Sequence, residues 1–293
     1  MPVDEADAGK GGVIASAVVA HVPTLGLPAN TPVYQQTLVE AERRLGAALR
    51  TTLRPDVWVI LSSHWVATFD WPVTCQARHR GHCVATEAPQ LIPGSPYDYR
   101  GDPELGAALV DAFNAGGVPS VRNESSHFVW DYGTFVPMMH LDPDAEIPVV
   151  MLPSVAQATV QECQAAGALV HATASSLGRR VVFLASTALS HVLVRGREHR
   201  PTPERIEADK RFLAQLEAGD IETAITDFDA YRKLSGLEMG GRPLATMLGV
   251  AQAMAAAAGP LKGRQYGDYA QSSGSGNVVM ALAPAQSLAQ MAN

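Results

Sequence analysis

The stretch Val57-Trp58-Val59-Ile60-Leu61-Ser62-Ser63-His64 is an apolar run, rich in β-branched residues, that ends in two serines and a histidine. Two further stretches repeat this design: residues 13–20 lead into His21, and residues 181–190 lead into His191. Short apolar runs bounded by turn-forming residues are typical of buried strands. Open α/β sheets bind ligands beyond the carboxyl ends of their strands. We therefore expect the three histidines to converge on one edge of a sheet.

The composition of the chain favours a globular protein with a large core, since 47% of its 293 residues are hydrophobic and 17% are charged. A net charge of −7 without a dense basic cluster argues against nucleic acid and anionic membranes as partners. The chain has no apolar run of the roughly 18–20 residues that cross a bilayer, and its start lacks the features of a signal peptide. Three irregularly spaced cysteines favour reduced thiols, so we expect a cytoplasmic protein.

The pattern of apolar residues predicts one α/β domain over residues 11–284, with a flexible N-terminus at 1–10 and a C-terminal tail at 285–293 outside the core. Helices are expected over about 33–52, 103–115, 156–177, 203–218, 220–234 and 244–257. Further strands are expected over about 118–121, 147–152 and 277–283. We expect irregular strands and a long loop over the edge of the sheet at 70–103, a loop over 266–275, and an aromatic-rich, turn-punctuated segment over 127–137.

Two of the histidines and one acid suggest a metal site. Two imidazoles and one carboxylate on one face of a divalent ion suit non-haem Fe(II), because substrate and oxygen can bind opposite them. His21 and His64 supply the imidazoles, and Glu238 stands out because burying an acid among glycines and apolar residues is costly unless it is paired. The alternatives stay open, because strand-end histidines are more often structural, and Glu238 could pair with Arg242 or cap the following helix. His79 and His82 resemble a metal tract but lack partners.

Five short motifs favour the metal site over the structural alternatives. They occur in one order along the chain: His21-Val22-Pro23, Ser62-Ser63-His64-Trp65, Asp131-Tyr132-Gly133-Thr134-Phe135-Val136-Pro137, Leu189-Ser190-His191 and Gly236-Leu237-Glu238. In this order the sequence resembles the class III extradiol ring-cleavage dioxygenases, the superfamily of the protocatechuate 4,5-dioxygenase catalytic subunit. The resemblance spans about residues 13–283. It lies nearest to the branch of the homoprotocatechuate 2,3-dioxygenases and 2-aminophenol 1,6-dioxygenases.

The resemblance implies a single-domain α/β/α sandwich around a mixed central sheet. It also implies Fe(II) bound by His21, His64 and Glu238, with His191 as the acid–base histidine. The expected reaction opens the ring of a catechol-type aromatic, such as a dihydroxyphenyl acid, with insertion of both atoms of O2. A 2-aminophenol is the alternative substrate, and a homo-oligomer is the expected assembly.

The sequence departs from the family at two motifs. Tyr132 stands where many members have histidine, and a phenol that titrates near 10 cannot act as a base at neutral pH. His127, five residues upstream, is therefore the candidate for a second catalytic role. Around His191 the chain lacks a glycine that the family often has, which we expect to tighten the turn or narrow the pocket. The substrate-binding candidates are Tyr132, Trp65 and Arg242.

Two other functions compete with ring cleavage. A zinc ion held by His and Glu ligands with one open position would support hydrolysis instead. A metal-free partner subunit that resembles the family is the third possibility, although the presence of all three candidate ligands argues against it.

Overall fold

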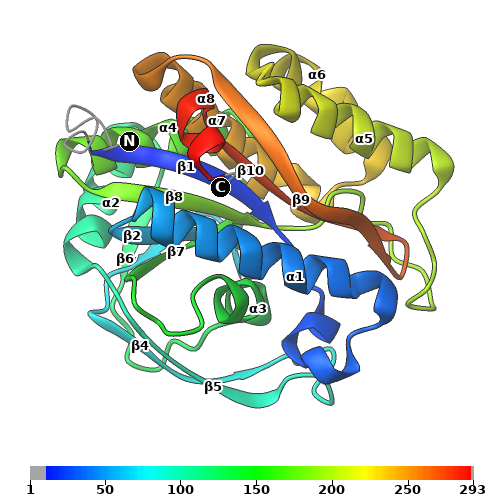
Figure 1. The fold of residues 1–293 in the computed structure, drawn as a ribbon. Helices are drawn as coiled ribbons and strands as arrows, with labels where there is room; N and C mark the ends of the chain where they lie inside the picture. Colours follow the sequence, from blue (N-terminus) through cyan, green and yellow to red (C-terminus); the bar gives the residue numbers. More distant parts are fainter. Residues whose placement is uncertain (1–10, 292–293) are drawn as a thin grey trace.

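A computed structural model of the protein describes residues 11–291 (Figure 1). The predicted flexible residues 1–10 and the last two residues of the predicted tail lie outside the described part. Figure 1 shows one central sheet between two layers of helices, with α1 and α3 on one face and α4 and α7 on the other. The predicted α/β/α sandwich around a mixed sheet is confirmed. Among the residues that the structure describes, no helix combines the length and apolarity needed to cross a membrane.

The central sheet has the strand order β7-β2-β8-β1-β10-β9. Its first four strands are parallel to one another, and β10 and β9 are antiparallel to their neighbours. The strands are β7 (Val149–Val155), β2 (Val57–Ala67), β8 (Arg180–Ser186), β1 (Gly12–Val19), β10 (Ser275–Pro284) and β9 (Leu261–Ser272). Two small sheets lie beside it, formed by β3 (Trp71–Thr74) with β6 (Ser120–Asn123) and by β4 (Arg78–Val84) with β5 (Pro93–Arg100).

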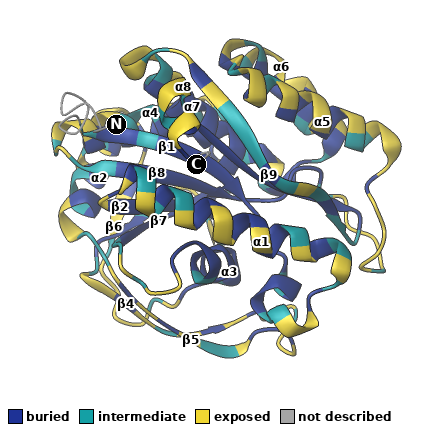
Figure 2. Ribbon diagram, viewed as in Figure 1, coloured by how far each residue is buried: buried dark blue, intermediate teal, exposed yellow. Residues whose placement is uncertain are grey.

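The α-helices are α1 (Val33–Ala48, continued by a π-helical turn over Leu49–Leu53), α2 (Pro103–Ala115), α3 (Tyr132–Leu141), α4 (Val160–Ser176), α5 (Pro203–Ala218), α6 (Ile221–Ser235), α7 (Arg242–Ala258) and α8 (Ala285–Gln290). Six of them lie close to the predicted ranges, whereas α3 and α8 were not predicted. Short 3₁₀ turns occur at η1 (Pro23–Gly26), η2 (Pro28–Asn30) and η4 (Glu238–Gly241). Figure 2 shows that the inner strands of the sheet are buried, while the edge strand β9 and the outer helix faces are partly exposed.

The two faces of the sheet explain why its strands are continuously apolar. Along β2, Val57, Val59 and Leu61 pack with the α4 and α7 layer, whereas Trp58 and Ile60 pack with the α1 and α3 layer. Successive side chains of a strand point to opposite faces, so a strand covered on both faces must be apolar at every position. This is why a run without alternation predicted a central strand.

Two segments predicted as irregular are regular in the structure. Residues 266–275 lie mostly in β9, whose pairing with β10 shifts in register between Asn277 and Val279, opposite Ala270 and Tyr266. A bulge of this kind, here around Gly267 with its positive φ of 69°, breaks the period of two by which a strand is recognised. Residues 132–141 form α3, although Pro137 lies inside it. In both places the turn-forming residues suggested a loop, but pairing of β9 with β10 and packing of α3 on β2 give regular structure.

The predicted C-terminal tail is also part of the fold. Residues 285–290 form α8, and Leu288 and Met291 are buried with the α1 side of the core. The expectation that the tail lies outside the core was therefore wrong for its described residues. Two apolar side chains spaced three residues apart lie on one face of a helix, which is enough to attach a short segment.

One buried acid on α1 generates a prediction about stability. Glu42 is fully buried, and within residues 11–291 its carboxylate oxygens accept no hydrogen bond of ordinary geometry. Burial raises the pKa of Glu42 well above its ordinary range, and the opposing effect of the Ala20 backbone is smaller. A raised folded-state pKa means that stability is greatest below about pH 4.3, the usual value in unfolded chains, and falls as pH rises through the folded pKa. Glu42→Met should therefore increase the free energy of unfolding by about 1–3 kcal/mol at pH 8, and by less at pH 5.

Thermal or urea unfolding of wild type and variant at both pH values measures this difference. Glu40→Met, at an exposed position of the same helix, is the matched control and should change stability by less than about 0.5 kcal/mol at either pH. A stability gain at Glu42 that does not depend on pH would contradict the assignment.

Candidate metal centre

Three ends of adjacent parallel strands meet at one edge of the sheet, as the sequence predicted. His21 lies two residues beyond β1, and His191 lies five residues beyond β8. His64 differs from expectation, because β2 continues past it to Ala67. The pairing of β2 with β7 jumps from Ser62 to Val66, so His64 and Trp65 lie in a bulge that interrupts the strand. A bulge re-aims side chains, which is how His64 reaches the edge from within a strand.

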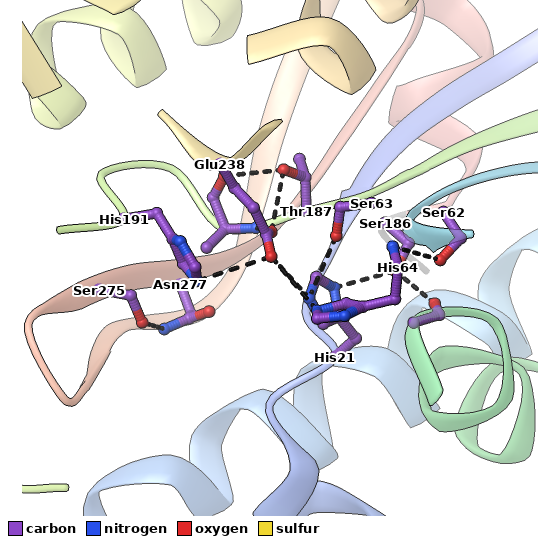
Figure 3. A network of polar contacts seen from close by, with 12 residues as sticks. His21, Ser62, Ser63, His64, Ser186, Thr187, His191, Glu238, Ser275 and Asn277 are labelled. Atoms are coloured by element: carbon purple, nitrogen blue, oxygen red, sulfur yellow. Dashed lines mark hydrogen bonds and ion pairs between the residues drawn. The ribbon is translucent and has the colours of Figure 1, made fainter. Parts of the chain in front are cut away.

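Glu238 comes to this edge from η4, between α6 and α7 (Figure 3). One carboxylate oxygen, Oε1, lies 3.3 Å from His21 Nε2, 3.4 Å from His64 Nε2 and 3.6 Å from His191 Nε2. The other oxygen, Oε2, accepts a hydrogen bond from the backbone N–H of Ala188 at 2.7 Å. The carboxylate is thus anchored by one oxygen and offers the other to the imidazoles.

The donor atoms of these residues fit a divalent metal ion. One nitrogen each of His21 and His64 and one oxygen of Glu238 all lie within 4.8 Å of one another. Neighbouring ligands at about 2.1 Å from a metal ion lie roughly 3 Å apart, close to the two Oε1–Nε2 distances. Two imidazoles and a carboxylate are the donor set of non-haem Fe(II) sites, although zinc accepts the same donors. The structure therefore brings together the three predicted ligands.

The charges of the site depend on one another. Burial alone would raise the pKa of Glu238, but the neighbouring imidazoles of His21, His64 and His191 hold it well below its usual range. Burial also acts to lower the pKa of His64, but the hydrogen bond and charge of Glu238 outweigh it, and the pKa is raised. Burial and the two neighbouring imidazoles lower the pKa of His191, against the pull of Glu238. The lowered pKa of His191 favours its neutral imidazole form.

The Asp131-Tyr132-Gly133 motif holds the bulge of β2 in place. Asp131 caps the N-terminus of α3 and accepts a hydrogen bond from Ser62 Oγ at 2.5 Å, and Ser62 Oγ in turn accepts the backbone N–H of His64 at 3.1 Å. A Cβ on Gly133 would overlap Ser62 Oγ, which explains the glycine. The ring of Tyr132 lies 4.0 Å from that of His64, centroid to centroid, so it lies beside the candidate ligands.

Arg242, a predicted substrate-binding residue, hydrogen-bonds to backbone carbonyls, one of them next to Glu238. Its guanidinium donates to the backbone carbonyls of Met239, Ala156 and Ala158. Met239 has a positive φ of 48°, a conformation that side-chain-bearing residues rarely adopt. The arginine thus braces the strained turn that follows Glu238, and its orientation is fixed by backbone groups.

The segment that carries His191 is held on three sides. Ser190 and His191 form isolated bridges with Leu237 and Ser275, respectively. Asp209 of α5, fully buried, accepts hydrogen bonds from Ser190 Oγ at 2.6 Å and from the Ser190 N–H at 3.3 Å. It also accepts the hydroxyls of Tyr231 and Tyr269, at 2.8 and 2.6 Å. No sequence motif indicated this buried carboxylate.

The remaining predicted site residues lie around this centre. Trp65 follows His64 in the bulge, is half-buried and packs on Phe128 with ring centroids 4.6 Å apart. His127 is exposed in the loop before α3, and among the described residues its side chain has no hydrogen bond to the ligand cluster. Thr187, at the site of the missing glycine, is buried with its hydroxyl 3.2 Å from Glu238 Oε2. At the position where the family often has glycine, this chain therefore has a threonine whose hydroxyl contacts a candidate ligand.

Comparison with known proteins gives the family. The model of the catalytic LigB subunit of aromatic ring-opening dioxygenase matches residues 15–280. The chain is 26% identical to the 3,4-dihydroxyphenylacetate 2,3-dioxygenase of Escherichia coli over 192 residues, which cover 60% of this chain and 65% of that enzyme. It is 28% identical to the alpha subunit of 2-aminophenol 1,6-dioxygenase from a Pseudomonas species over 254 residues, covering 82% and 88% of the two chains.

A solved structure supports the fold. An uncharacterized protein of Escherichia coli K12 superposes with a TM-score of 0.64 over 92% of this chain and 99% of that chain, at 17% sequence identity. Because the family model spans nearly the whole sandwich and all five motifs, the chain belongs to the LigB family of class III extradiol ring-cleavage dioxygenases.

Proposed function

We propose that the protein is a non-haem Fe(II)-dependent dioxygenase that opens the ring of a catechol-type aromatic and inserts both atoms of O2. The observation that carries this proposal is the convergence of His21, His64 and Glu238 on one point at the carboxyl edge of the sheet. The family and its relatives that act on dihydroxyphenylacetate support the reaction class. A dihydroxyphenyl acid is the substrate that we favour.

In this proposal the protein's own groups bind the ring and move protons. Bound Fe(II) would lower the pKa of a chelated ring hydroxyl and give O2 a site beside the ring. His191, neutral and 28% exposed at its side chain, is placed to accept a hydroxyl proton and return it later. Trp65 and Tyr132 supply aromatic faces against which a flat ring can pack. We assign no proton-transfer step to His127, which is exposed in its loop.

A 2-aminophenol is the second candidate substrate. The alpha and beta subunits of 2-aminophenol 1,6-dioxygenase both match this chain, the alpha subunit over 88% of its length. The adjacent amino and hydroxyl groups of a 2-aminophenol can chelate a metal ion through two neighbouring atoms, as the two hydroxyls of a catechol can. We propose an oligomer, with copies of this chain, in a cytoplasmic setting that suits the three buried free cysteines Cys75, Cys83 and Cys163.

The proposal is tested by oxygen uptake of Fe(II)-loaded protein with a panel of catechols and 2-aminophenols. Oxygen consumption with a yellow ring-opened product is the expected outcome. Zinc in the anaerobically purified protein without oxygen uptake would favour the hydrolase instead. Folded protein that binds no Fe(II) would favour a metal-free subunit.

Glu238→Gln should abolish metal binding. The backbone N–H of Ala188 requires an oxygen at the Oε2 position, so the glutamine NH2 group would face the two imidazoles and repel a cation. We expect the Fe(II) affinity, measured by anaerobic titration, to fall more than about 100-fold. Glu87→Gln is the control, since this exposed carboxylate lies 3.9 Å from the other side of His64. Equal losses in both variants would contradict the role of Glu238.

His191→Asn should separate chemistry from metal binding. Loss of a general acid–base lowers turnover by about 100- to 10,000-fold, whereas His21, His64 and Glu238 remain to hold the metal. Steady-state oxygen uptake and metal content measure the two effects. His199→Asn, on the same loop with its side chain 55% exposed, should keep wild-type turnover. Full activity of His191→Asn would remove His191 from the mechanism.

A further inference from the structure

The proline inside α3 leaves one carbonyl group without its helical partner. In an α-helix the N–H of each residue donates to the carbonyl four residues earlier. Pro137 has no N–H, so the carbonyl of Gly133 receives none from it. A proline inside a helix is strongly unfavourable, and this helix is short and packs directly on the strands of the site. The proline therefore calls for an explanation at Gly133.

Ser186, the last residue of β8, supplies the missing donor. It is fully buried, and its hydroxyl lies in close contact with the carbonyl oxygen of Gly133. A carbonyl oxygen carries no hydrogen, so the single hydrogen of the serine hydroxyl must lie on this contact. The same hydroxyl oxygen lies 3.1 Å from Nδ1 of His21. With its hydrogen used, Ser186 presents only lone pairs to His21.

His21 must then carry a hydrogen on Nδ1. In a neutral imidazole the other nitrogen, Nε2, has the free lone pair. Nε2 faces Oε1 of Glu238 at 3.3 Å, and two acceptors at this distance repel one another unless a cation lies near both. A neutral imidazole binds metals through its unprotonated nitrogen. The tautomer set by Ser186 is therefore the one that a metal ion needs.

We propose that Pro137, Gly133 and Ser186 are positioning residues that fix His21 in its Nδ1–H tautomer, so that Nε2 is the nitrogen offered to a divalent cation. We name this chain of contacts the His21 relay. The relay rests on the proposed metal site. In it, the proline of the Asp131–Pro137 motif influences a metal ligand without touching the metal. The proline acts by leaving an acceptor open for the serine.

Two variants interrupt the His21 relay at different points. Ser186→Ala removes the acceptor for Nδ1–H, and the Fe(II) dissociation constant should rise about 10- to 100-fold. Pro137→Ala restores an N–H that competes for the Gly133 carbonyl, and the dissociation constant should rise by the same effect about 10-fold, the lower end of that range. Because the proline no longer interrupts the helix, Pro137→Ala should also raise the melting temperature by about 2–6 °C. Metal affinity and stability should thus move in opposite directions, which general damage to the fold would not produce.

Ser16→Ala is the matched control. Its hydroxyl is buried on the neighbouring strand β1 and has no hydrogen-bond partner in the described part of the chain. Anaerobic titration with Fe(II) should give this variant a dissociation constant within two-fold of wild type. If Ser186→Ala or Pro137→Ala also stays within two-fold of wild type, the relay is overturned.

The tautomer itself can be read without metal or substrate. Nitrogen-15 NMR of the metal-free protein at pH 9, well above the pKa of about 6.5 of a free imidazole, distinguishes Nδ1–H from Nε2–H at His21. We expect Nδ1–H in the wild type and a shift towards Nε2–H in Ser186→Ala. Finding Nε2–H in the wild type would overturn the relay whatever the titrations give. Failure of the protein to bind Fe(II) or open any ring would instead count against the proposed function, because the NMR readout needs neither.

Discussion

One carboxylate oxygen facing three imidazole nitrogens is the interaction on which the site depends. Glu238 is buried, and a buried charge without partners is unstable in a protein interior. The protein solves this by giving Oε2 a backbone N–H and Oε1 a set of histidines. The arrangement is balanced when a cation or protons occupy the space between Oε1 and the rings. The same electrostatic requirement therefore accounts for the stability of the turn at η4 and for the metal binding that we propose.

The sheet topology makes this arrangement possible. Because β2, β8 and β1 are adjacent and parallel, the segments that follow them reach the same edge, and loops at that edge need only small adjustments to meet. The bulge in β2 and the strained turn after Glu238 are two such adjustments. Each is held by polar contacts from another element, Asp131 for the bulge and Arg242 for the turn. Local strain in the site is thus offset by contacts outside it.

Much of this could be predicted from the sequence, for identifiable reasons. The strands covered on both faces read as unbroken apolar runs, so β1, β2 and β8 and the residues at their ends were recognised. His21, His64 and Glu238 were found through residue chemistry and the resemblance to a family. β9 was missed because a bulge at Gly267 hides its periodicity, and α3 because its proline suggested a turn.

Contacts between residues that share no recognisable sequence pattern could not be predicted from the sequence. Ser186 and Asp209 have ordinary neighbours in the sequence, and their importance lies in partners 53 residues away at Gly133 and 19 residues away at Ser190. Arg242 was placed near the site, but the sequence did not reveal that its partners are backbone carbonyls. The types of the side chains were therefore enough to predict which residues lie together at the site. The donors and acceptors that hold them in place became clear only from the three-dimensional structure.

The buried carboxylate of Asp209 has a consequence for motion. Donors from three parts of the chain, namely the segment before His191, α6 and β9, converge on it. Releasing any one of them removes a hydrogen bond from a buried carboxylate, so we expect these parts to open together. Amide hydrogens around Ser190 should then exchange with solvent as slowly as those of the neighbouring helix pair, although they lie in a loop at the mouth of the site. We therefore expect the loop that carries His191, the proposed acid–base residue, to move with the core of the protein, and substrate entry to rely on other segments.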